Sequence, residues 1–171
     1  MTLTDFQQNA PIATATAAIL GFVLALCTLC VQRQIARRRA AIDLFLKTEM
    51  DDKIVKAFND FENAVKELNN AQSMKEFEST DAYTKICQCL NIHELIAIGI
   101  NNKILDERIC YDFWEYEMVR AYIDTKRLID FERAKPGCAE TYADLTRLQK
   151  TWSRPRRIWQ RWRSRCWPLG L

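Results

Sequence analysis

Histidine, glycine and proline are scarce in this chain of 171 residues, which contains one His, four Gly and four Pro. So few turn-forming residues argue against a turn-rich all-β fold and against a low-complexity chain. The glycines are also too isolated to build a phosphate-binding loop. A nucleophile–His–acid set is implausible when the one histidine stands on an apolar segment. Because no pair of carboxylates stands out for acid–base work, we expect a protein that is not an enzyme and has no cofactor.

Charged side chains are absent from residues 6–32, a run of 27 positions. A helix of roughly 20 apolar residues crosses the ~30 Å hydrocarbon core of a bilayer, so we interpret residues 11–32 as a transmembrane helix. A cleaved secretory signal would need a basic segment before the run, where only Asp5 stands. A buried core helix is the third interpretation. Small residues in the run would permit close helix packing, but an anchor tolerates them anywhere, so they do not by themselves predict a dimer.

Basic residues follow the apolar run and none precedes it; they are Arg33, Arg37, Arg38 and Arg39. The positive-inside bias therefore predicts that residues 1–10 lie outside the cytoplasm and that everything from Arg33 onward is cytoplasmic.

The other charges divide into two blocks. Residues 40–144 carry 13 basic and 21 acidic side chains, whereas residues 145–171 carry eight basic side chains and no acidic one. Basic segments near a leaflet are attracted to anionic lipid, so we expect the lipid bilayer to be one partner of the basic segments.

Residues 153–171 form a basic tail rich in Trp and Arg. Its aromatic and basic side chains are typical of an interfacial amphipathic helix on the inner leaflet. A solvated terminus is the simpler interpretation. Nucleic acid is a further, less favoured partner, since Arg neutralises phosphate and Trp stacks on bases. The residues expected at the membrane interface are Arg37, Arg38, Arg39, Arg156, Arg157, Trp159, Arg161 and Trp162.

The seven cysteines have irregular spacing, and a cytoplasmic domain keeps thiols reduced, so no disulfide framework is expected. Cys87, Cys89 and His93 lie close together in sequence. A structural zinc site needs four convergent ligands, and no fourth is evident here. We therefore predict ordinary packing for this group and no metal site.

A helical pattern continues through residues 33–152 and predicts a bundle of about five helices after the membrane helix, an all-α fold. Asn91 and Glu94 have the spacing of a capping box, which would start or restart a helix there. Residues 95–100 are apolar on nearly every face, which indicates the centre of the core. A single helix is expected over Glu107–Ala134, since it contains no Gly or Pro, and the last one carries Tyr142 to Trp152.

Three segments together suggest a family. They are Arg37–Ala40 with Ile42 and Asp43, Glu94–Ile100, and Leu105–Glu107 followed by Trp114 and Val119–Arg120. In this order the chain resembles, over about residues 33–152, the domain-of-unknown-function family 4760 of small, mostly bacterial, single-span membrane proteins. The resemblance implies a membrane-tethered all-helical domain, in a bacterium at the inner membrane. It supplies no catalytic residue.

Glu94 and Arg120 match polar positions of this family beside the most apolar segments. A buried ion pair between them would fix helix register. The functional alternative is a polar contact for a ligand or partner, and plain solvent exposure is the third.

These observations predict a membrane-anchored, non-enzymatic protein-interaction or scaffold module that binds a protein partner or assembles with itself. A regulatory or sensory module that reads a small ligand or the state of the membrane is the alternative. A roomy pocket near Glu94 and Arg120 would favour the latter.

Overall fold

The computed structural model describes the backbone of residues 3–154 and the side chains of residues 14–154, and helices are the regular elements in this part of the chain. They are α1 (Leu3–Met50), α2 (Asp52–Asn70), α3 (Met74–Phe77), α4 (Asp81–Asn101), α5 (Glu107–Asp124), α6 (Lys126–Arg133) and α7 (Ala143–Trp152). The predicted all-α class is confirmed. The bundle that follows α1 holds the expected long helices together with the single turn α3.

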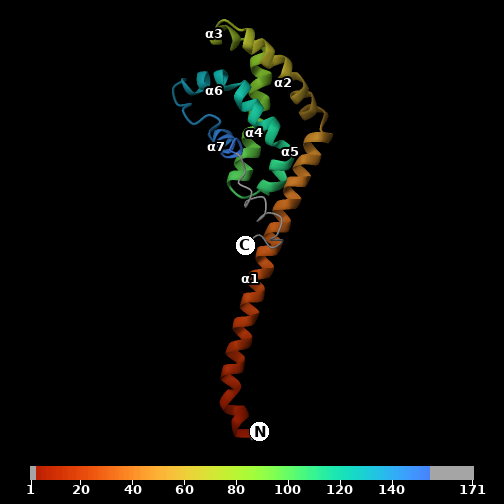
Figure 1. Ribbon diagram of the computed structural model, residues 1–171, viewed down its shortest axis with the longest axis vertical. Helices are drawn as coiled ribbons and strands as arrows, with labels where there is room; N and C mark the ends of the chain where they lie inside the picture. The colour runs from red at the N-terminus through yellow and green to blue at the C-terminus, as the bar shows by residue number, and fades with distance from the viewer. Residues whose placement is uncertain (1–2, 155–171) are drawn as a thin grey trace.

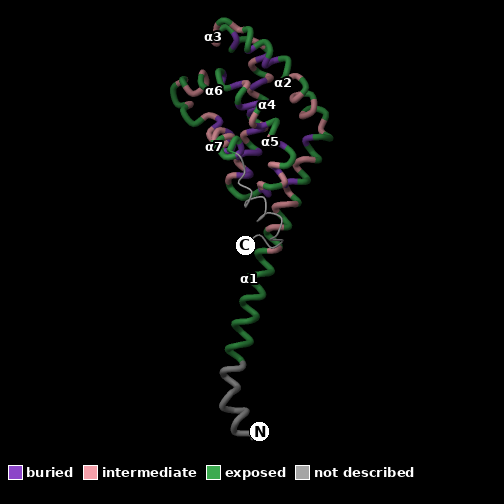
Figure 2. The backbone as a smooth tube through the Cα atoms, viewed as in Figure 1, coloured by how far each residue is buried: buried purple, intermediate pink, exposed green. Residues whose placement is uncertain are grey.

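Helix α1 is one continuous rod of 48 residues that extends far beyond the other helices (Figure 1). The helix does not break where the apolar run meets Arg33, and its C-terminal part, from Arg37 onward, lies along the bundle (Figure 1). The segment from Thr14 is long enough and apolar enough to cross a membrane, and its most apolar 18-residue window has no buried residue. Residues 14–30 of α1 are accordingly exposed, which Figure 2 shows in green above the grey end of the helix.

Helix α4 forms the centre of the bundle and packs against α2, α5 and α7. As expected from the apolar segment, Ile96, Ala97 and Ile100 are at most 2% exposed. Leu95 differs, being 69% exposed. An aliphatic side chain on the outer face of α4 is therefore left in solvent.

Two expectations about helix boundaries are wrong. The capping-box spacing at Asn91 does not start a helix, because α4 runs unbroken from Asp81 to Asn101. The helix expected over Glu107–Ala134 is divided at Thr125 into α5 and α6. The buried Thr125 hydroxyl donates a 2.6 Å hydrogen bond to the carbonyl of Ala121. Such back-bonding by threonine bends helices, and sequence periodicity does not reveal it.

Polar side chains cap the first turns of α2, α4 and α5. The Asp51 carboxylate accepts from the backbone N–H of Lys53, and the Thr80 hydroxyl accepts from that of Tyr83. Asp106 accepts from the backbone N–H groups of Arg108 and Ile109. Each cap satisfies donors that have no partner inside their own helix.

Gly99 allows the loop between α4 and α5 to turn back against α4. A Cβ atom at Gly99 would lie 2.8 Å from Cδ1 of Leu105, which is itself only 7% exposed. The backbone N–H of Leu105 also donates a 3.0 Å hydrogen bond to the carbonyl of Gly99.

We predict that Gly99→Ala destabilises the domain by about 1–3 kcal/mol, since the added methyl group overpacks this contact. Urea unfolding of the full chain in mild detergent measures the change. In a Leu105→Ala background the same substitution should cost much less, because the clashing atoms are gone. An equal cost in both backgrounds would contradict the contact.

Candidate functional site

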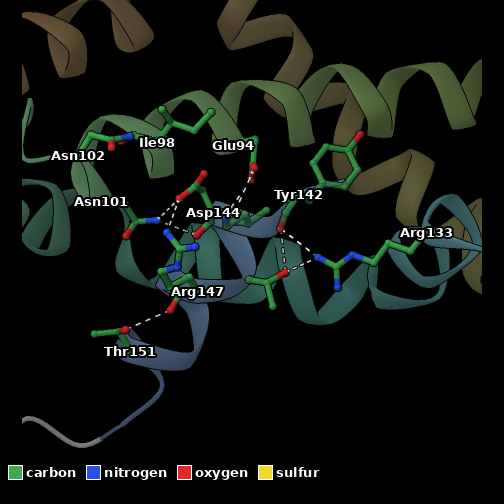
Figure 3. Close-up of polar contacts among 11 residues, drawn as sticks. Glu94, Ile98, Asn101, Asn102, Arg133, Tyr142, Asp144, Arg147 and Thr151 are labelled. Atoms are coloured by element: carbon green, nitrogen blue, oxygen red, sulfur yellow. Dashed lines mark hydrogen bonds and ion pairs between the residues drawn. The ribbon is translucent and has the colours of Figure 1, made fainter. Parts of the chain in front are cut away.

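The expected ion pair between Glu94 and Arg120 is wrong, because each side chain is engaged elsewhere. The two carboxylate oxygens of Glu94 accept hydrogen bonds from the backbone N–H groups of Asp144, at 3.1 Å, and Leu145, at 2.8 Å. Glu94 on α4 thus reaches the first turn of α7 (Figure 3). Tyr142 at the N-cap of α7 has a left-handed backbone, with φ of 57°, and supplies no side-chain cap. Glu94 provides from another helix the acceptor that α7 lacks.

Arg120 lies on the surface of α5. Its guanidinium pairs with Glu62 of α2 at 3.6 Å and with Asp124 one turn further along α5 at 3.3 Å. The cation also lies 5.9 Å from the centre of the Tyr116 ring. Exposed pairs of this kind contribute little to stability.

The beginning of α7 is held by further polar contacts. The Asn101 side-chain amide donates to both the backbone carbonyl and the carboxylate of Asp144, at 3.1 Å and 2.7 Å (Figure 3). The Arg133 guanidinium donates to the carbonyl of Tyr142 and to the hydroxyl of Thr146. Together with the contacts of Glu94, these hydrogen bonds join α4 to α7. Glu94, which matches a polar position of the family, therefore has a structural role.

A cleft of about 650 Å³ opens between α1, α2, α4 and α5. Aromatic side chains form much of its wall: Phe45 of α1, Phe58 and Phe61 of α2, and Phe113 and Trp114 of α5. The rings of Phe45 and Phe113 stack with their centres 4.0 Å apart, and Phe113 is still 46% exposed. Sequence patterns did not predict this cleft, because its wall is assembled from four separate helices.

His93 lies at the buried end of the cleft, only 3% exposed and stacked on Phe58 with the ring centres 5.5 Å apart. Burial lowers the pKa of His93 to about 4 and raises the pKa of the neighbouring Cys89 thiol to about 12. Cys89 Sγ lies 4.0 Å from His93 Nδ1. Both groups are neutral near pH 7, so the pair holds no thiolate nucleophile.

Acidic side chains predominate around the cleft. The carboxylates are Glu49, Glu62, Glu117 and Asp124, against the two cations Lys66 and Arg120. The lining thus combines aromatic rings with an excess of negative charge, which favours an apolar group that carries a positive charge. Arg120 borders this cleft, whereas Glu94 does not.

Among the basic residues expected at the membrane interface, two have partners inside the chain. Arg37 donates from Nη2 to the carbonyl of Leu105 at 3.1 Å, and Arg38 pairs with Asp106 at 3.6 Å. Arg39 is exposed. Arg37 and Arg38 therefore fasten α1 to the start of α5. The remaining candidates lie outside the described residues, namely Arg156, Arg157, Trp159, Arg161 and Trp162.

A family model described as a domain of unknown function, DUF4760, matches residues 15–152. The chain belongs to this family. The DUF4760 match begins within the apolar part of α1, so it covers more than the residues 33–152 that carried the resemblance. Comparison with curated proteins gives no match, and comparison with solved structures gives none either.

We predict that Glu94→Ala lowers the free energy of unfolding by about 1–3 kcal/mol, because two backbone donors of α7 lose their acceptor. Arg120→Ala is the matched control and should change it by no more than about 0.5 kcal/mol. Urea unfolding measures both variants. An equal loss in the two would contradict the different roles assigned here.

His93 gives a spectroscopic test of burial, because it is the one histidine in the chain. Its imidazole ¹H–¹³C signal should titrate with a pKa of about 4. An unfolded histidine titrates near 6.5. As the pH falls below about 6.5, the histidine of the unfolded chain binds a proton, whereas the buried imidazole of the native domain stays neutral. The domain should therefore lose stability. A native titration near pH 6.5 would contradict the buried position.

Proposed function

We propose that this DUF4760 protein is a non-enzymatic, membrane-anchored interaction module that binds a protein partner through the cleft between α1, α2, α4 and α5. The aromatic cleft with the buried His93 at its end carries the proposal. A partner segment would insert aliphatic or aromatic side chains between the rings and set Lys or Arg against the acidic border. Aromatic anchors inside a pocket supply much of the binding energy of protein interfaces.

Membrane anchoring by α1 is the second part of the proposal. Its support is the length and exposure of the apolar helix and the arginines that follow. The positive-inside bias orients the helical domain toward the cytoplasm, at a bacterial inner membrane. The basic tail, residues 153–171, would then face the anionic leaflet, with the more acidic domain held away from it.

The alternative function is a regulatory or sensory module that reads a small ligand. The volume of the cleft, about 650 Å³, favours it, since pockets for small molecules span roughly 300–1,000 Å³. The charge of the lining indicates an apolar cation for this alternative. A protein occupant and a small-molecule occupant of the cleft would give different adducts in the photo-crosslinking experiment that follows.

Photo-crosslinking from the cleft tests the function. We expect Phe113→p-benzoylphenylalanine, introduced into the full chain in native membranes, to form an adduct with one partner polypeptide. Tyr116, which is 64% exposed on the same helix and is not part of the cleft lining, is the control position. Mass spectrometry identifies the attached peptide.

The adduct should be specific to position 113 and should carry a basic peptide with apolar side chains. A small-molecule adduct would favour the sensory alternative. An adduct with residues 153–171 of the same chain would assign the cleft to its own tail. Equal labelling from positions 113 and 116 would contradict a binding site in the cleft.

A further inference from the structure

The loop between α4 and α5 forms the end of the helical domain that lies toward the apolar part of α1 (Figure 1). Two contacts hold this end to α1. The Arg37 guanidinium donates to the carbonyl of Leu105 at 3.1 Å, and Arg38 pairs with Asp106 at 3.6 Å. The loop therefore stands at about the height of Arg37 on the long helix.

The continuity of α1 relates this height to the membrane. Residues 11–31 cover about 31 Å of helix, which matches the ~30 Å hydrocarbon core of a bilayer. Arg37 follows Val31 by six residues, or about 9 Å of the same helix. The headgroup layer is about 5–8 Å thick on each side. A helix tilt of about 20° toward the loop, the average for membrane spans, lowers a loop about 10 Å from the axis by about 3 Å, into this layer.

The loop presents a cation and an aliphatic side chain at this height. Lys103 is exposed and Ile104 is 60% exposed, whereas Leu105 turns back into the core. The backbone N–H groups of these three residues donate to the carbonyls of Ile100 or Gly99. Because these donors are satisfied inside the chain, the loop can leave water without the cost of unpaired N–H groups.

The backbone of Lys103 is left-handed, with φ of 61°. Glycine usually occupies such a position after a helix, since a Cβ atom makes this conformation strained. The ion pair of Lys103 with Glu107, at 3.9 Å, joins side chains that are 61% and 36% exposed and contributes little. Stability therefore does not explain a lysine here, whereas a contact of its ammonium group with lipid phosphates would.

Charge distinguishes this end from the rest of the domain. Residues 37–39 and 103–108, which we call the basic corner, carry five basic and two acidic side chains. One of the two acids, Asp106, caps α5 and is only 8% exposed. The remainder of residues 40–144 carries 11 basic and 19 acidic side chains. An anionic leaflet therefore attracts the basic corner and repels the rest of the domain.

We propose that the basic corner lies in the headgroup layer of the cytoplasmic leaflet and binds anionic phospholipid. Lys103 and the exposed Arg108 lie beside the lipid phosphates, and Ile104 lies between the headgroups. The proposal rests on the membrane anchoring proposed above and is independent of the cleft. It gives the domain a second attachment beside α1, and this attachment fixes the direction in which the long helix tilts.

Fluorescence quenching in lipid nanodiscs tests the contact on the full chain. An environment-sensitive fluorescent amino acid replaces Ile104 or, as the control, Leu95. Leu95 is 69% exposed on α4, about 13 Å along that helix from the loop. Phosphatidylglycerol that carries a nitroxide just below its headgroup should quench position 104 several-fold more than position 95.

The same discs test the preference for anionic lipid. Quenching at position 104 should be stronger with the nitroxide on phosphatidylglycerol than with the same amount on phosphatidylcholine. Lys103→Gly should remove much of this preference without lowering the urea midpoint, because glycine suits the left-handed backbone. Lys75→Ala is the matched control, since Lys75 is exposed on α3 at the opposite end of the bundle (Figure 1). It should keep the preference.

Three results would overturn the proposal. Equal quenching of positions 104 and 95 would show that the basic corner does not reach the leaflet. Equal quenching by the two nitroxide lipids would show that it does not bind anionic lipid. A preference that survives Lys103→Gly, or that Lys75→Ala also removes, would show that Lys103 is not the contact.

Membrane fractionation separates these failures from a failure of the anchoring. A chain that enters the membrane and gives any of the three results overturns the basic corner alone. A chain found in the aqueous fraction without detergent overturns the anchoring and the basic corner together.

Discussion

The burial of α4 among α2, α5 and α7 is the constraint on which the other features depend. It places Ile96 and Ile100 in the core, brings Leu105 against Gly99, and directs the Glu94 carboxylate at the first turn of α7. It also sets His93 at the end of the cleft, where neighbouring side chains remove it from water. Stability and the candidate binding site therefore share one helix.

Local sequence signals predicted the features that depend on local chemistry. The caps at Asp51, Thr80 and Asp106 are contacts of this kind, because each short polar side chain satisfies backbone donors only two or three residues further along the chain. The core position of Ile96, Ala97 and Ile100 followed from the absence of polar side chains in residues 95–100, although Leu95 was expected in the core as well and is exposed. The all-α class followed from periodicity and from the scarcity of turn residues.

Features that depend on contacts between distant segments were not predictable in the same way. The backbone N–H of Asp144, which donates to the Glu94 carboxylate, lies 50 residues away in sequence. The capping-box spacing of Asn91 and Glu94 therefore suggested a local role that Glu94 does not have. The division at Thr125 depends on one buried hydroxyl that bonds back to Ala121. The cleft needs Phe45, His93 and Phe113 to meet from three helices. The spacing of residues within one segment does not reveal contacts between side chains of different helices.

The continuity of α1 has a mechanical consequence for the cleft. Phe45 and Glu49 belong both to the cleft wall and to the same unbroken helix as the apolar run. Arg37 and Arg38 attach that helix to the start of α5, at a point between the apolar run and the cleft. Because the helix is unbroken, a tilt of its apolar part about this point would be carried to Phe45, one of the two stacked rings in the cleft wall. Leverage of this kind would link the opening of the cleft to the inclination of the rod.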